Sequence, residues 1–179
     1  MELIGLSRCI LDWLIQANRS SNYPYDCVIL NSNPDAKYSF VEWAQKIDAN
    51  FEKHYWIGPA STESRHINKR NIYKDTLNSS IHYTDYQLRP NFLIALVLSP
   101  QMVKKEHAKQ AIEQCRLHLL NESKSIGIKT LDSSDFNYCG TYDNANDSND
   151  TKVAHGFNYH QGPEWFCFLF YISSLFAYS

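Results

Sequence analysis

Apolar side chains recur every three or four residues in several stretches of the chain, and this spacing is typical of a helix with one buried face. The first stretch ends at the polar run 18–22, before Pro24. The apolar positions of this first predicted helix are Leu3, Leu6, Ile10, Trp13, Leu14 and Ala17. A second helix is predicted from Ser39, because Glu42 three residues later completes a capping box. Its expected buried positions are Phe40, Trp43, Ala44, Ile47 and Phe51.

The same spacing predicts a helix from about 104 to 120. Its apolar face consists of Ala108, Ala111, Ile112, Cys115 and Leu119. Residues 92–98 are seven consecutive apolar residues, which fit either a buried strand or a buried helix. Pro90 favours the helix, because proline is common at a first helical position.

Less regular patterns fill the remaining chain. Residues 58–83 are polar and aperiodic, which predicts a long loop with a short strand or two. A turn and a short strand are expected within 121–136, and residues 143–150 should form a solvated loop. The last segment, 163–178, is apolar all round and predicts a buried helix with Pro163 and Glu164 in its first turn.

Composition narrows the class of protein. With 44% hydrophobic and 20% charged residues and a net charge of −2, the 179-residue chain predicts one globular domain without affinity for nucleic acid. The longest apolar run, 165–172, is too short to span a membrane. The N-terminus lacks the basic start of a signal peptide, so a cytoplasmic location is expected. Five cysteines without a CxxC pair predict reduced and mostly buried thiols.

Common metal and nucleophile motifs are missing. An EF-hand loop starting at Asp143 would put Ala145 at a ligand position, and one starting at Asp147 would put Lys152 where glycine belongs. There is no HExxH, GxSxG or P-loop sequence. We therefore expect neither a metal nor a cofactor.

Two polar segments precede predicted apolar helices. They are DYQLRPNF at 85–92 and GFNYHQGPEW at 156–165. Both segments fit a ligand cleft in which two helix N-termini direct polar side chains at one molecule, with Glu164 as a working carboxylate. The structural alternative is that Asn and Asp cap the helices, that Arg89 pairs with Asp85, and that Trp165 belongs to the core.

These two segments occur with three further motifs in an order that resembles a known family. The motifs are YKD (73–75), GIKTLD (127–132) and YCGTYDN (138–144), and ELIGLS (2–7) and NFEK (50–53) also fit. Over residues 2–165 the chain resembles the C-terminal glucosidase domain of eukaryotic glycogen debranching enzymes. The 85–92 and 156–165 segments also resemble those of the wider amylo-α-1,6-glucosidase group.

The resemblance implies a mainly α fold, an incomplete (α/α)6 toroid with a few short β-strands in its loops. It implies a helix at 90–98 and an active site in the funnel at one end of the inner helices. The implied reaction is hydrolysis of the α-1,6-linked glucose at trimmed branches of glycogen or limit dextrin, with inversion and without a cofactor. Inversion requires a general acid and a general base on opposite faces of the sugar.

The same resemblance implies roles for individual residues. Glu164 falls on the glutamate of the family's HQGPEW motif and would be the general base. The positions expected to hold the glucose are Asp85, Arg89, Asn91, His160, Gln161 and Trp165. The family's general acid lies in a CGTWMD-like motif that the chain does not contain.

Departures from the family divide the chain into two parts. Residues 1–165 are expected to be a partial glucosidase domain, and 166–179 a divergent apolar helix. The 4-α-glucanotransferase region is absent, and domains of a parent chain are expected to complete the fold. Two alternatives remain: a glycan-binding remnant without catalysis, and an inactive fold fragment.

Overall fold

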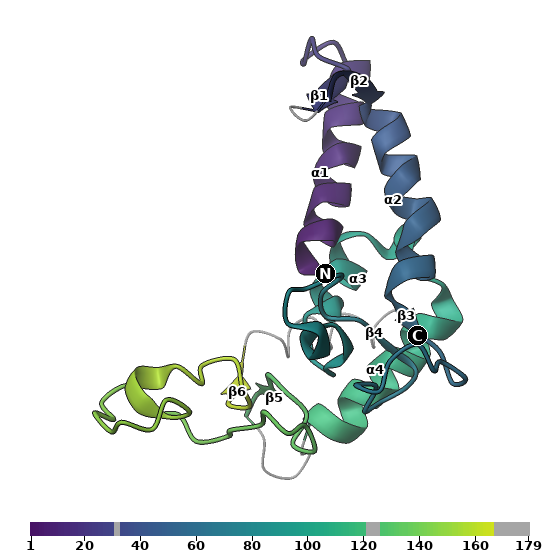
Figure 1. Ribbon diagram of the computed structural model, residues 1–179. Helices are drawn as coiled ribbons and strands as arrows, with labels where there is room; N and C mark the ends of the chain where they lie inside the picture. Colours follow the sequence, from purple (N-terminus) through teal and green to yellow (C-terminus); the bar gives the residue numbers. More distant parts are fainter. Residues whose placement is uncertain (31–32, 121–125, 167–179) are drawn as a thin grey trace.

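The computed structural model describes residues 1–30, 33–120 and 126–166. Its regular structure is mainly helical, with short strands between the helices (Figure 1). The α-helices of this described part are α1 (Glu2–Arg19), α2 (Phe40–Tyr55), α3 (Phe92–Leu98) and α4 (Lys105–Leu119). The strands are β1 (Cys27–Leu30), β2 (Asn33–Ser39), β3 (Trp56–Ile57), β4 (Ile72–Tyr73), β5 (Ile128–Lys129) and β6 (Glu164–Trp165). Three 3₁₀ turns are His82–Tyr86, Pro100–Met102 and Ala154–Gly156.

The long helices α1 and α2 run side by side in opposite directions, and the β1–β2 hairpin joins them at one end (Figure 1). The predicted capping box starts α2: the Ser39 hydroxyl accepts from the Glu42 nitrogen at 3.1 Å, and the Glu42 carboxylate accepts from the Ser39 nitrogen at 2.8 Å. Both helices predicted from spacing at this end of the chain are therefore confirmed.

The contact between α1 and α2 is partly apolar and partly ionic. Leu11 of α1 packs with Phe40 and Ala44 of α2 in a small buried cluster. Nearer the other end, the buried Arg8 donates Nε to Asp48 at 2.8 Å and Nη2 to the same carboxylate at 3.0 Å. This pair compensates the charge that Arg8 carries into the helix interface.

Helix α3 crosses α1 at a glycine. A Cβ on Gly5 would lie 2.7 Å from the Cβ of Ala95, which is too close for two carbons. The close approach also lets the buried Ser99 hydroxyl donate to the Gly5 carbonyl at 2.9 Å. The helix implied for residues 90–98 is confirmed, beginning at Phe92.

Helix α4 completes the main core with the apolar face that its spacing predicts. Ala108, Ala111, Cys115 and Leu119 are buried in it, and Ile112 is half-buried against it. Full burial raises the pKa of the Cys115 thiol. The other three cysteines in the described part are half-buried, so the expectation of mostly buried thiols is wrong for them.

One carboxylate ties α2, β4 and α4 together beside this core. Glu52 accepts from the Tyr73 hydroxyl at 2.7 Å and from the Lys104 nitrogen at 2.6 Å. Its second oxygen lies 2.7 Å from Nδ1 of His107, whose ring stacks on Trp56 at 4.1 Å. These contacts account for the polar groups at this edge of the core.

The irregular segments largely follow expectation. The 58–83 loop contains the short strand β4, which pairs with β3, and the strand expected within 121–136 is β5. Residues 143–150 form an exposed loop of turns and bends. No helix in the described ranges is both long enough and apolar enough to cross a membrane.

The predicted helix at 163–178 is wrong at its start. Glu164 and Trp165 form strand β6, which pairs with β5 through Ile128–Trp165 and Lys129–Glu164. Residues 167–179 lie outside the described part of the chain. The local apolar pattern predicts a helix here, but pairing with a distant strand determines the backbone.

Candidate active site

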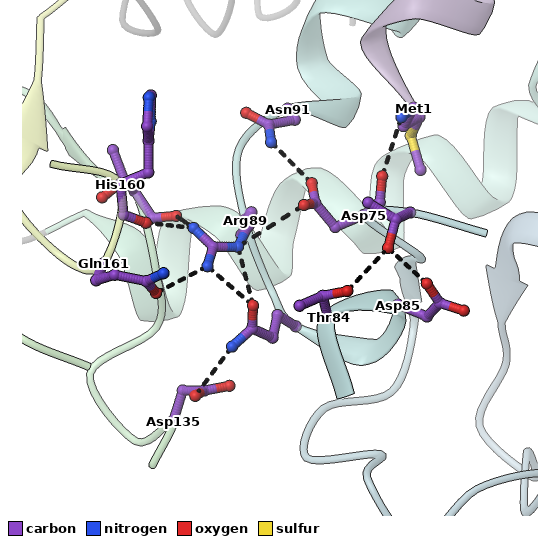
Figure 2. A network of polar contacts seen from close by, with 12 residues as sticks. Met1, Asp75, Thr84, Asp85, Arg89, Asn91, Asp135, His160 and Gln161 are labelled. Carbon is purple, nitrogen blue, oxygen red and sulfur yellow. Dashed lines mark hydrogen bonds and ion pairs between the residues drawn. The ribbon is translucent and has the colours of Figure 1, made fainter. Parts of the chain in front are cut away.

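The two polar segments predicted to share a site do meet, and Arg89 joins them (Figure 2). Its side chain is 9% exposed. Its guanidinium donates to Gln87 Oε1 at 2.9 and 3.1 Å, to the Thr130 carbonyl at 3.2 Å and to Gln161 Oε1 at 3.0 Å. It also donates to the carbonyl of His160. One side chain therefore connects three parts of the chain that are distant in sequence.

Asp75 is the acidic partner of this guanidinium. Its carboxylate lies 3.7 Å from Arg89 Nε and accepts from Asn91 Nδ2 at 2.8 Å (Figure 2). Burial raises the pKa of the Asp75 carboxyl, against the opposing effects of Arg89 and Asn91. Burial likewise lowers the pKa of Arg89, against the carboxylates of Asp75 and Asp135. Burial therefore disfavours both charges, and each partner's charge opposes that effect.

Asp85 does not contact Arg89, so the pairing suggested by their sequence spacing is wrong. Its buried carboxylate accepts from the Thr76 hydroxyl and from the backbone nitrogens of Asn78 and Ser79, at 2.9 and 3.2 Å to these nitrogens. Its own backbone carbonyl accepts from the Asp75 nitrogen at 3.1 Å. Asp85 thus fixes the turn at 76–79 next to the network around Arg89.

Glu164 lies on β6, and this strand packs very closely against the backbone just before β5. A Cβ on Gly127 would be 2.7 Å from the backbone carbonyl carbon of Trp165. The Thr130 nitrogen donates to the Pro163 carbonyl at 3.2 Å, and Thr130 Oγ1 accepts from the Gly162 nitrogen at 2.9 Å. Glu164 therefore does not lie at the helix N-terminus that the predicted cleft required.

The Glu164 side chain is exposed, and its carboxylate accepts from the Ile126 nitrogen at 3.3 Å. It also lies near the Tyr138 hydroxyl. Burial, with the negative charge of Glu164 as a smaller cause, raises the pKa of Tyr138. A carboxylate with this access to solvent can exchange protons with water.

Aromatic rings gather around Trp165, the residue that follows Glu164 on β6. The half-buried Trp165 packs against Tyr159 at 4.4 Å and against His160 at 4.8 Å, measured between ring centroids. Tyr142 lies 5.3 Å from Tyr159, which is itself 44% exposed. Exposed rings next to a carboxylate offer a surface against which the apolar face of a sugar can stack.

Sequence reasoning missed Asp75, Gln87 and Thr130 as parts of this network. Gln87 stands in the polar run before α3, and it also donates to Asp135 Oδ1 at 3.2 Å. Asp75 follows the apolar pair that forms β4. The signals available for it were its place two residues after a buried apolar pair and its place in the YKD motif.

Comparison with known proteins agrees with the resemblance inferred from the motifs. The model of the amylo-alpha-1,6-glucosidase family matches residues 1–178. The chain belongs to this family. The family match spans residues on both sides of Trp165, and the division there into two parts stays a prediction.

The chain is also 35% identical over 173 residues to the glycogen debranching enzyme of Saccharomyces cerevisiae strain S288c. The match covers 92% of this chain but 11% of the yeast protein. The chain thus corresponds to a small part of that relative's length.

Proposed function

We propose that this chain forms part of a glucosidase domain that hydrolyses α-1,6-linked glucose at trimmed branch points of glycogen, in the cytoplasm. Membership of the amylo-alpha-1,6-glucosidase family supports the bond type. The name of the yeast relative supports glycogen or a limit dextrin as the substrate. In this proposal the (α/α)6 toroid and the 4-α-glucanotransferase region are completed by further parts of a longer chain.

Glu164 acts as the general base in this reaction. It takes a proton from a water molecule, and the water attacks the anomeric carbon from the face opposite to the leaving oxygen. A carboxylic acid outside the present sequence protonates that oxygen, and the glucose leaves with inverted configuration. The observation that carries the proposal is the exposed Glu164 carboxylate on strand β6, which continues into Trp165 and its ring contact with His160.

The six other predicted site residues divide by what they touch. The rings of His160 and Trp165 lie against each other, and we assign them to contact with the sugar. Polar atoms of three of these residues are hydrogen-bonded within the network around Asp75: Arg89, Asn91 and Gln161. The carboxylate of Asp85 accepts hydrogen bonds from the 76–79 turn. We assign these four to holding the loops that carry the rings and Glu164.

By itself the chain should release no glucose, because it has the base without the family's acid motif. General acid catalysis contributes roughly 10²–10⁴-fold to such a reaction. A second candidate function, glycan binding without hydrolysis, is favoured by the exposed rings of Tyr142 and Tyr159. Glucose release from a limit dextrin by the 179-residue chain, above a heat-killed control, would refute the prediction that the chain is inactive by itself.

A chimera tests the base. The chain replaces the stretch of the yeast glycogen debranching enzyme that it matches, and glucose release from limit dextrin is measured. Glu164→Gln keeps the side-chain shape but cannot take a proton, so the rate should fall at least about a hundredfold. The transferase activity, in another region, should stay unchanged. Glu113→Gln is the control, because Glu113 is an exposed glutamate on α4.

Azide separates the two stereochemical outcomes in the Glu164→Gln chimera. A small anion can take the place of the activated water, so inversion yields β-glucosyl azide from the α-linked substrate. An α-azide product, or a glucosyl group trapped on Glu164 in the parent chimera, would instead make Glu164 a nucleophile. A Glu164→Gln rate within threefold of the parent's would remove the base assignment altogether.

A further inference from the structure

The segment that carries Glu164 has little regular secondary structure of its own. Between Asn158 and Trp165 the described backbone forms turns and then the two-residue strand β6. It is tied to the rest of the protein by the β5–β6 pair, by backbone bonds to Thr130 and Cys139, and by the contacts of His160 and Gln161 with Arg89. Arg89 is therefore one of the groups on other segments that fix the place of Glu164, and it is the charged one that reaches both His160 and Gln161.

Arg89 in turn depends on Asp75. The guanidinium is buried, and most of its hydrogen-bond acceptors are neutral: an amide oxygen of Gln87, one of Gln161, and backbone carbonyls. Asp75 is the carboxylate in direct ionic contact with it, at 3.7 Å. A buried cation that loses its charged partner is strongly disfavoured, and it moves toward water when it can.

We infer that Asp75 is a positioning residue for Glu164: by holding the Arg89 guanidinium in the interior, it fixes the 158–165 segment where the base acts. This inference rests on the proposed function for its catalytic meaning. The effect of Asp75 on the position of the 158–165 segment does not depend on the proposed function, so it can be tested in the chain without measuring activity.

Asn91 is the third residue of this network and contacts Asp75. Its Nδ2 donates to Asp75 Oδ1, so it orients the carboxylate whose other oxygen meets Arg89. Asn91 precedes α3 without making a side-chain capping bond to that helix. An Asn91→Ala change therefore removes the contact with Asp75 and leaves both charges and the helix cap as they are.

Hydrogen exchange of the 179-residue chain, read by mass spectrometry, tests the coupling. Asp75→Asn keeps the size of the side chain and an acceptor for Asn91 but removes the charge. We expect peptides within 158–165 to exchange at least about tenfold faster, and peptides of α1 and α2 to exchange as before.

Asp48→Asn is the matched control. It also removes the charge of an aspartate paired with a buried arginine, Arg8, but it does so in the α1–α2 interface, where Asp12 remains as a second ionic partner of Arg8. It should leave the exchange of 158–165 unchanged. If both variants accelerate that segment equally, the effect of Asp75 is general destabilisation and the inference is wrong. If Asp75→Asn does not fold, Asn91→Ala should show the same local acceleration, to a smaller extent, and its failure to do so is equally decisive.

Kinetics of the chimera separate positioning from sugar binding. Asp75→Asn should lower kcat by about a hundredfold, the typical cost of displacing a catalytic group by about 1 Å, with KM within threefold of the parent's. A rise in KM with unchanged kcat would make Asp75 a binding residue and overturn the inference. An active Glu164→Gln chimera would refute the proposed function alone, because the exchange experiment does not use activity.

Discussion

Replacement of Gly127 by alanine should open the β5–β6 pair. The added methyl would lie 2.7 Å from the carbonyl carbon of Trp165, 2.8 Å from its oxygen and 3.0 Å from its nitrogen. All three atoms are backbone, so no side-chain rotation relieves the clash. Ordinary contact begins near 3.4 Å, so β6 has to move by about 0.4–0.7 Å, the difference between 3.4 and these three distances.

Two opposing effects set the size of the change in the free energy of unfolding. Overpacking of this kind costs about 1–3 kcal/mol. Alanine also restricts the unfolded chain, which stabilises by about 0.4–1 kcal/mol where the backbone accepts it. Gly127 does not have a positive φ, so this gain applies. We therefore expect a net loss of about 1–2 kcal/mol, with Glu164 displaced together with its strand.

Urea unfolding measures the free energy, and hydrogen exchange locates the change. Gly58→Ala is the control, because its methyl would meet a side-chain atom, Trp56 Nε1, at 3.1 Å and needs only a small shift. Exchange should accelerate around β5 and β6 in Gly127→Ala and not in Gly58→Ala. Equal stability of Gly127→Ala and the parent, with β6 exchanging at the parent rate, would refute the close packing of these strands.

Three further predictions concern charge, a thiol and the surface. Burial would raise the pKa of Asp132, but hydrogen bonds from Ser134 and an ion pair with Lys69 lower it overall. Asp132→Asn should therefore lower the urea midpoint at pH 7. The difference between variant and parent should shrink as the pH falls through the lowered pKa of Asp132. Cys115 should resist iodoacetamide in the native chain and react in urea, as mass spectrometry of the alkylated peptides would show, because its thiol is fully buried. The outer face of α1 leaves Leu3, Leu6, Ile10 and Trp13 between 43% and 70% exposed, so the chain should sediment above monomer mass and Trp13→Glu should shift it toward the monomer; a parent chain that sediments as a sharp monomer would contradict this.

Patterns of neighbouring residues correctly predicted the three longest helices in the described part of the chain. The spacing of apolar residues located α1, α2 and α4, and a hydroxyl with a glutamate three residues later placed the start of α2 at Ser39. The seven apolar residues of α3 carry no such spacing, and the family resemblance was needed to identify a helix there.

The parts that were wrong depend on distant contacts. Glu164 follows a proline and precedes an apolar run, which is a local helix pattern, but it pairs with Lys129, 35 residues earlier in sequence, on strand β5. Arg89 and Asp85 are four residues apart, which suggests a pair, whereas Arg89 reaches back to Asp75. The family motifs identified Glu164 as the candidate base, but nothing in the local pattern could show its partners.

The contacts of Arg89 also fix the order in which the site can be assembled during synthesis. Its acceptors at Thr130 and Gln161 lie 41 and 72 residues later in the chain. While a nascent chain is being elongated, α1 and α2 can pair as soon as the hairpin between them has formed, but the guanidinium stays hydrated until residue 161 has emerged. Loops that long close more slowly than local contacts. The segment that carries Glu164 thus reaches its place after α1 and α2 can already have paired, and a ribosome that stalls before Gln161 leaves these helices without the contacts of Arg89 to that segment.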